Sequence, residues 1–282
     1  MLDVLARNEY GFSINFKNNN KFDIVEVTGL NPVSATINSS SIPDYVGSVF
    51  DNAYVGNRNI VISIAYNTYN ADARQELNEC FIPSIPIRLY IDDYFIDGYT
   101  ESVDYNQFNK KMIIQISIIC LYPYFSEKND NIIKVSNIIN LLEFPLNLPS
   151  VGVPFGELQD STSTNISILG DIGTGCIIEA FFDENIDGFK VINTTHNQVV
   201  FVDKYFYPGQ KLKIDTRFSK KSIILTDTNG NEIDILQYLD TSDINFIELE
   251  PNNNIIVFKD GYDSPIYNTD IYIYYTNKKG GL

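Results

Sequence analysis

Few residues in this sequence have side chains that could carry out catalytic chemistry, and His196 is the first to consider. It is the only histidine, so a Ser–His–Asp or Cys–His arrangement would have to use it. It lies in the polar stretch 193–198, which indicates a turn between two strands. A tight hairpin is a poor place to hold an imidazole between a nucleophile and an orienting acid. We therefore predict a solvated turn residue at this position and no catalytic residue in the chain.

Residues 183–188, D-E-N-I-D-G, match the first six positions of an EF-hand calcium loop. The twelfth position is Thr194, where such a loop requires a bidentate glutamate. The flanking residues favour strands rather than helices. The better interpretation is an acidic β-turn in which Gly188 supplies the positive φ angle, with calcium binding as the alternative.

Two other patterns suggest ligand chemistry only superficially. Residues 170–175, G-D-I-G-T-G, resemble a phosphate-binding loop, but they contain no lysine and no helix is expected after them. A turn between two strands accounts for these glycines. Asp92, Asp93 and Asp97 are close in sequence, and a glycosidase needs two carboxylates that face each other across a cleft. They belong to an expected hairpin, which gives no reason to expect a cleft, so we predict no cofactor and no cofactor-binding residue.

The three cysteines, Cys80, Cys120 and Cys176, are far apart and odd in number. They lack the C-x-x-C and Cys/His spacings of zinc sites, and they do not suit a disulfide framework. We expect reduced, buried thiols and no metal site.

Composition excludes several classes of function. The 282 residues carry a formal net charge of -16, and neutralising nucleic-acid phosphates needs clustered Lys and Arg. A hydrophobic fraction of 44% is enough for buried cores. Residues 1–12 lack the basic start and apolar run of a signal peptide. The apolar stretch 112–119 is interrupted by Gln115 and Ser117, which indicates a strand rather than a membrane span.

Hydrophobic periodicity predicts a mainly β chain with one helix. The helix is expected over 71–81, with Asn70 as its N-cap and Pro83 beyond its end. Asp92-Asp93 is expected to form a hairpin turn. Residues 31–55 are polar and irregular, so we expect a long loop there, which is either functional or ordered by a partner. The other strands expected in the first half are 10–16, 22–27, 58–66, 85–91, 94–104 and 110–121.

The second half is expected to be an antiparallel β-sandwich. It contains many short strands separated by turns rich in Gly and Asn, and it lacks a helical period. Prolines at 145, 149 and 154 break the preceding pattern, so we place a linker at 131–154, between domains at 1–130 and 155–282. The expected strands are 163–169, 175–182, 188–193, 198–202, 211–215, 222–226, 232–236, 246–249, 254–258 and 270–275.

Short motifs follow one another in an order that characterises one known family. In the first half these are an Arg-Asn strand start, an Arg-bearing helix, a G-Y-x-E-S strand and a C-x-x-P-Y-F end; they stand at 58–59, Arg74, 98–102 and 120–125. In the second half they stand at 170–175, 189–193, 208–216, 229–230, 249–255, 273–275 and 280–281. Thr100 replaces a usual apolar residue, and Asn252 takes a usual glycine place, which a turn tolerates. Over most of its length the sequence resembles the siphophage distal tail protein family, often called Dit.

The resemblance implies a function as well as a fold. The N-terminal domain would be a β-barrel or sandwich with one helix that forms a homo-hexameric ring around a channel, with a galectin-like β-sandwich outside it. The ring would be a structural part of the virion tail tip, assembled in the host cytoplasm, in a phage or phage-tail-like particle. It would join the tail tube to the baseplate or adsorption apparatus. Implied partners are the tail tube protein, a tail-tip hub or tail-associated lysin, and receptor-binding proteins or side fibres. DNA would pass through the channel without specific binding, and no membrane is involved.

Two alternatives to this structural role stay open. The first is a carbohydrate-binding module that contacts the host cell wall, suggested by a sandwich-like second half with many tyrosines. The second is a wall hydrolase, which would require the carboxylates to converge.

Overall fold

The computed structural model describes residues 2–17, 19–44, 46–66, 71–106, 113–135, 138–140, 156–158, 162–241 and 246–282. The chain forms two compact units: Met1–Lys128 with Lys278–Leu282, and Asn129–Asn277. The second unit is therefore inserted near the end of the first. The expected boundaries differ from this division in two places, because residues 131–135 form a strand of the second unit and the last five residues return to the first. The expected linker otherwise lies largely outside the described residues.

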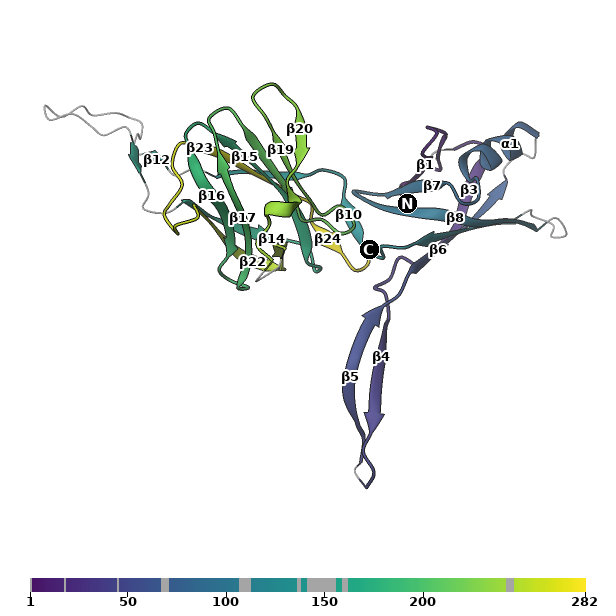
Figure 1. Ribbon diagram of the computed structural model, residues 1–282. Coiled ribbons are helices and arrows are strands. Elements are labelled where there is room, and N and C mark those ends of the chain that lie inside the picture. The colour runs from purple at the N-terminus through teal and green to yellow at the C-terminus, as the bar shows by residue number, and fades with distance from the viewer. Residues whose placement is uncertain are drawn as a thin grey trace, which may run out of the picture. The chain divides into compact units, whose positions relative to one another are not determined.

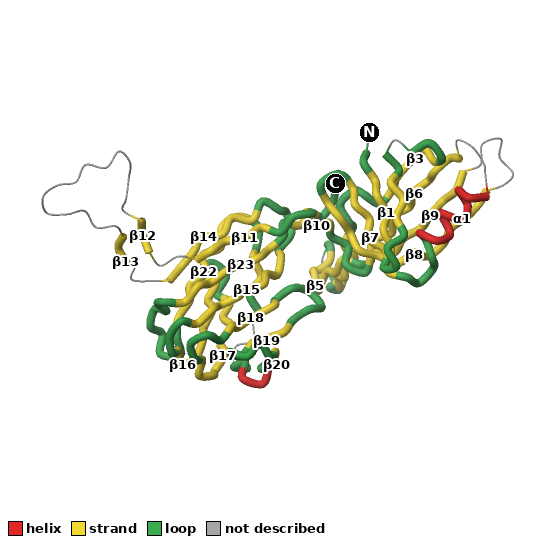
Figure 2. The backbone as a smooth tube through the Cα atoms, turned by 90° about the horizontal axis from the view of Figure 1, so that it is seen from above, coloured by secondary structure: helices red, strands yellow, loops and turns green. Residues whose placement is uncertain are grey.

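An antiparallel sheet builds the first unit, with strand order β2-β1-β7-β8-β9-β6-β3 (Figures 1 and 2). Strand β10 pairs with the start of β8 and also with the C-terminal strand β24. The strands are β1 (Val4–Asn8), β2 (Ser13–Asn15), β3 (Phe22–Thr28), β6 (Arg58–Tyr66), β7 (Pro86–Ile91), β8 (Tyr94–Asn106), β9 (Ile113–Cys120), β10 (Phe125–Glu127) and β24 (Lys278–Lys279).

One face of this sheet is buried and the other faces solvent. Strand β9 alternates buried isoleucines with partly or fully exposed residues, as the period of two requires. Helix α1 (Ala71–Cys80) packs against β1 and β2 and contributes buried Ala73 and Leu77 to the core. The expected helix is thus confirmed, whereas its expected N-cap, Asn70, lies outside the described residues.

The hairpin expected at Asp92-Asp93 is confirmed: β7 and β8 pair around it, and Asp92 has a positive φ of 49°. The loop expected over 31–55 is wrong. Its residues form a two-stranded antiparallel hairpin of β4 (Ala35–Ser41) and β5 (Ser48–Val55), which we call the arm. Figure 1 shows the arm extending away from the strands of its own unit. The sequence of the serine-rich strand β4 does not predict a strand, because all its residues are exposed and burial therefore imposes no alternation of apolar and polar residues.

Two sheets enclose the core of the second unit, so the expected antiparallel sandwich is confirmed. Their strand orders are β11-β23-β15-β18-β19-β20 and β14-β22-β16-β17. Side chains from both sheets, among them Ile178, Phe189 and Phe258, form one buried cluster. The strands are β11 (Asn131–Val135), β14 (Thr162–Ile168), β15 (Thr174–Phe182), β16 (Ile186–Asn193), β17 (Gln198–Phe206), β18 (Lys211–Asp215), β19 (Ser222–Thr226), β20 (Glu232–Asp234), β21 (Glu248–Leu249), β22 (Asn252–Lys259) and β23 (Thr269–Tyr275), with a short helix η1 (Leu236–Tyr238) and a separate pair β12 (Ile138–Asn140) and β13 (Gly156–Leu158).

The turn before β22 explains one of the motifs. Asn254 is fully buried; its side-chain amide donates to the carbonyl of Glu250 at 2.8 Å and its oxygen accepts from the Glu250 N–H at 3.0 Å. Asn252 has φ of 75°, which is why glycine usually stands there. The motif asparagine therefore holds the turn closed, and its role is structural.

Candidate functional site

The structure places His196 in the exposed turn between β16 and β17, as expected. Asp183 and Glu184 lie in the turn between β15 and β16, where Glu184 accepts a 3.4 Å hydrogen bond from Asn268. Gly188 has the expected positive φ of 76°, but it lies at a β-bulge inside β16 and not in the turn itself. Among the described residues, no group of three or more His, Cys, Asp or Glu side chains is arranged to hold a metal ion.

The glycine-rich stretch 170–175 leads directly into β15. A Cβ atom added at Gly173 would lie 3.1 Å from carboxylate oxygens of both Glu248 and Glu250. Two carboxylates at the glycines repel an anion, so the site does not suit phosphate. The turn interpretation of these glycines accounts for the geometry.

The carboxylates of the β7–β8 hairpin make local structural contacts. Asp92 accepts a 3.0 Å hydrogen bond from the Asp3 N–H, and Asp97 pairs with Arg88 at 2.6 and 2.9 Å. Neither arrangement resembles the opposed acid pair of a glycosidase.

The cysteines are free and buried, as expected. Burial raises the pKa of Cys80, Cys120 and Cys176 to about 12. Thiols with this pKa stay protonated at neutral pH and are poor nucleophiles.

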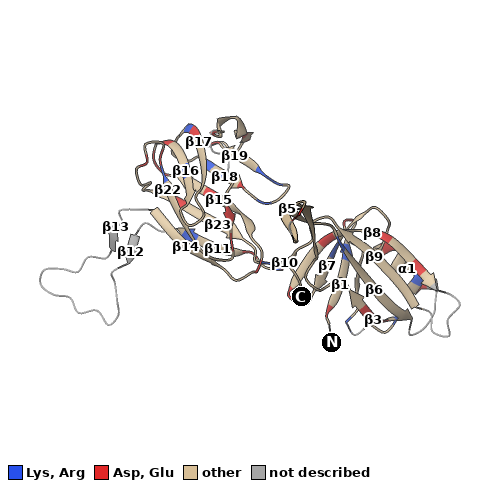
Figure 3. Ribbon diagram, turned by 90° about the horizontal axis from the view of Figure 1, so that it is seen from below, with Lys and Arg blue, Asp and Glu red and all other residues tan. Residues whose placement is uncertain are grey.

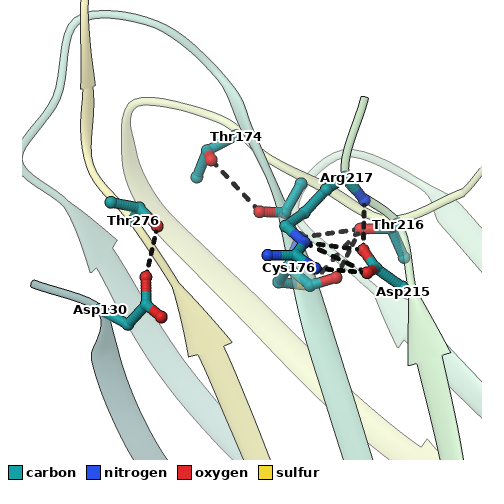
Figure 4. A network of polar contacts seen from close by, with 8 residues as sticks. Asp130, Thr174, Cys176, Asp215, Thr216, Arg217 and Thr276 are labelled. Carbon is teal, nitrogen blue, oxygen red and sulfur yellow. Dashed lines mark hydrogen bonds and ion pairs between the residues drawn. The ribbon is translucent and has the colours of Figure 1, made fainter. Parts of the chain in front are cut away.

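A polar network that the sequence did not suggest joins β15 to the end of β18 (Figure 4). Asp215 is buried and accepts hydrogen bonds from Arg217, which raises the pKa of that guanidinium. The Thr216 hydroxyl accepts from the Cys176 N–H at 2.8 Å and donates to the Cys176 carbonyl at 3.1 Å. These groups satisfy one another, so the network stabilises the sandwich rather than presenting a reactive group.

The arm has no evident role in stabilising the fold of a single chain. Every described side chain of β4 and β5 is exposed. Ile37 is 66% exposed and Phe50 is 63% exposed, and the exposed Val46 lies near the tip. An isolated two-stranded hairpin is marginally stable in water, so an arm of this length is expected to be stabilised by another surface.

The strand register divides the arm into two unlike faces. Cross-strand partners share a face, and a bulge between Asn38 and Ser39 keeps the faces in phase. The more apolar face carries Ala35, Ile37, Phe50, Ala53 and Val55, interspersed with Ser39, Ser41 and Ser48, while Tyr54 and Val49 lie on the other face. The other face is more polar: Asn38 donates to Asn52 at 2.6 Å, and Ser40 donates to Asp51 at 2.9 Å.

Arg58 fixes the base of the arm. It is 3% exposed and stands at the start of β6, directly after the arm. Its guanidinium donates to the carbonyls of Pro123 (2.6 Å), Asn31 (2.8 Å), Gly29 and Gly280, and it lies over the Phe125 ring. Desolvation lowers the pKa of Arg58, but an arginine stays charged at neutral pH even when shifted.

The C-terminal segment of the chain is part of this base. The Leu282 N–H donates to the Leu30 carbonyl at 2.9 Å. Gly281 packs so closely that a Cβ atom would lie 2.5 Å from the Pro32 nitrogen. The sequence motifs included Arg58 and the terminal glycines, but they did not predict that these residues lie close together. The pairing of β10 with β24 brings them close together.

The second unit matches a known family. Residues 169–278 match the family described as a siphovirus-type tail component, C-terminal domain. A comparison with characterised protein sequences finds no match. Most of the second unit is therefore similar to a tail component domain of the siphovirus type.

Solved structures with a similar fold span the whole chain. The Dit protein of phage SPP1 (gp 19.1), described as a paradigm of the hub adsorption apparatus in phages that infect Gram-positive bacteria, has a TM-score of 0.68 at 13% identity, over 98% of both chains. A structure of the phage P2 baseplate in its activated conformation with Ca is similar at a TM-score of 0.53 and 8% identity, over 100% of both chains. The phage p2 baseplate with Sr gives 0.51 and 10%, over 97% of this chain and 98% of that one. The family match and the shared fold confirm the resemblance to the distal tail protein family.

Proposed function

We propose that copies of this chain form a ring-shaped hub at the tail tip, which joins the tail tube to the baseplate or adsorption apparatus. The observation that supports it most is the arm, because an uncovered amphipathic hairpin with a rigidly held base suits a contact with an identical neighbour. A head-to-tail contact of this kind closes into a ring when the rotation closes. The proposed assembly is a homo-hexamer.

The partners follow from this role. One face of the ring would meet the tail tube protein, and the other a tail-tip hub or tail-associated lysin. The second unit would hold receptor-binding proteins or side fibres. The chain itself would be a connector and not an enzyme, located in the virion tail.

The charge distribution supports passage of DNA without specific binding. Acidic and basic residues are both spread over many elements of the two units (Figure 3), and the net charge is -16. Phosphates would meet no concentrated basic surface on these elements, so DNA would not be retained.

Electron microscopy of the purified full-length chain tests the proposal. We expect rings with a central channel. A variant in which residues 33–56 are replaced by a short Gly-Ser turn is expected to stay folded, by circular dichroism, and to form no rings. Single particles without rotational symmetry in the unaltered protein, at high concentration, would contradict the proposal.

A second candidate function, contact with cell-wall carbohydrate, has one observation in its favour. Tyr205 and Tyr207 are exposed and adjacent, with ring centroids 5.0 Å apart. Exposed aromatic faces suit stacking on sugar rings. Calorimetry with cell-wall glycans should then show binding by the full chain that Tyr205→Ala abolishes; no heat from any glycan would eliminate this function.

A further inference from the structure

Three exposed tyrosines of the second unit surround the carboxylate of Asp187, and we call these four residues the tyrosine patch. Tyr205 is the cross-strand partner of Asp187 in the pairing of β16 with β17, so their side chains share the outer face of that sheet. Tyr207 lies directly after β17, with its ring centroid 5.0 Å from that of Tyr205. The Tyr262 hydroxyl donates to the Asp187 carboxylate at 2.9 Å. The exposed fractions of Tyr205, Tyr207 and Tyr262 are 42%, 55% and 76%.

The loop 260–264, which follows β22, holds Tyr262 beside the start of β16. The Gly261 N–H donates to the Asp187 carbonyl at 2.7 Å, and a Cβ atom at Gly261 would lie 2.8 Å from that oxygen. The Asp260 carboxylate accepts a hydrogen bond from the Tyr262 N–H at 2.9 Å. The backbone therefore fixes where the Tyr262 side chain starts, and two segments that are far apart in the sequence build the patch.

The charge around the tyrosines is negative. Asp187 accepts the hydroxyl of Tyr262, and Asp263 follows that tyrosine in the chain. Lys190 is the one cation of β16, but it is already paired with Asp263 at 2.7 Å and its side chain is 17% exposed. An anionic ligand would be repelled here. An ammonium group would be attracted both by the carboxylate and by the electron-rich faces of the tyrosine rings.

We propose that the tyrosine patch is the saccharide site of the second unit and that its ligand is an amino sugar with a free, protonated amine. The inference rests on the second candidate function, and it names the ligand class and the residues that select it. Tyr205 and Tyr207 present aromatic rings for stacking on a sugar ring. Asp187 accepts charge-assisted hydrogen bonds from the ammonium group. Because the tyrosines are exposed, a polysaccharide can bind through sugars within its chain.

Calorimetry of the full-length chain, at a slightly acidic pH that keeps amino sugars protonated, tests the ligand class. The probes are tetramers of glucosamine, N-acetylglucosamine and galacturonate, which are cationic, neutral and anionic. We expect the glucosamine tetramer to bind about tenfold more tightly than the N-acetylglucosamine tetramer, equivalent to about 1.4 kcal/mol from an exposed cation–π contact and ion pair. The galacturonate tetramer is expected not to bind. Spermine, a polyamine without sugar rings, controls for general attraction to an acidic chain, and Tyr205→Ala should leave its binding unchanged.

Two substitutions separate the roles of charge and stacking. Asp187→Asn keeps an acceptor for Tyr262 but removes the charge, so it is expected to abolish the preference for the glucosamine tetramer and to leave binding of the neutral tetramer intact. Tyr205→Ala is expected to abolish binding of both tetramers. Asp23→Asn and Tyr10→Ala are the matched controls, because both residues are exposed and lie in the first unit, and neither should change binding.

The outcomes distinguish this inference from the function on which it rests. If the neutral tetramer binds and Tyr205→Ala removes that binding, but Asp187→Asn does not change the preference, the ligand class is wrong and the carbohydrate function stands. Tightest binding of the galacturonate tetramer would have the same meaning. Binding of the glucosamine tetramer that Tyr205→Ala leaves unchanged would reflect general charge attraction and would also overturn the inference. If no glycan binds, the inference and the carbohydrate function both fail.

Discussion

At the scale of single residues, Arg58 has the largest expected effect on stability. Its guanidinium is buried and its described hydrogen bonds all go to main-chain carbonyls. Those carbonyls come from three separate stretches of the first unit: the arm base, the β9–β10 connection and the C-terminal segment. A planar five-donor group can serve them together, whereas a lysine presents one compact charge.

Arg58→Ala is therefore expected to lower the free energy of unfolding by about 3 kcal/mol, because buried carbonyls lose charged donors. Arg58→Lys should recover only part of this loss. Urea unfolding followed by circular dichroism measures both. Arg88→Ala is the control: its ion pair with Asp97 is exposed, so the expected change is below about 1 kcal/mol. Equal losses at Arg58 and Arg88 would contradict the role given to Arg58.

At the scale of elements, the backbone at Gly29, before the arm, packs closely against the backbone at Asn59, after the arm, and this contact fixes the position of the arm base. Gly29 has φ of 84°, and a Cβ atom there would lie 2.1 Å from the Asn59 carbonyl oxygen. Gly11 has a similar φ of 90° with nothing within 4 Å of its Cβ position. The two glycines therefore differ in packing but not in backbone conformation.

Gly29→Ala should accordingly destabilise the chain by about 2 kcal/mol more than Gly11→Ala, which carries only the strain of a positive φ. Thermal unfolding of the two variants gives the comparison directly. A similar loss in both would mean that the backbone at the arm base moves to admit a side chain.

The same elements show how far sequence reasoning reaches. Strands β18 and β19 and the β7–β8 hairpin follow from alternation and turn residues, because each buries one face on a core. The arm buries neither face on its own unit, so its residues carry no such pattern and the sequence predicts a loop instead. Strand β1 is not predicted by the sequence either, because its five residues become a strand by pairing with β7.

The candidate site was predictable only in part. The sequence identified residues 31–55 as a segment that needs a partner, and it singled out Arg58 through a motif. It did not indicate that Arg58 meets the C-terminal segment, because β10 and β24 become neighbours only by pairing across a long sequence separation. Contacts of this kind depend on pairing between distant segments, which periodicity does not encode.

At the scale of the whole molecule, charge opposes association. Each chain carries a formal charge of -16, so copies in a ring repel one another. Salt screens charges beyond about 10 Å at 0.1 M, while the apolar arm contact does not weaken. The assembly should therefore dissociate at a higher protein concentration in low salt than in high salt. Sedimentation velocity at the two salt concentrations measures this, and tighter assembly in low salt would indicate contacts dominated by ion pairs.

The central claim is that this chain assembles into a closed ring through its arm. Light scattering coupled to size exclusion tests it most directly, because it gives the mass of the assembly without a standard. We expect about 192 kDa for the unaltered chain, six times the 32.0 kDa of one copy, and about 30 kDa for the arm-deleted variant. A mass of 32.0 kDa for the unaltered chain at every concentration, or an undiminished assembly without the arm, would contradict it.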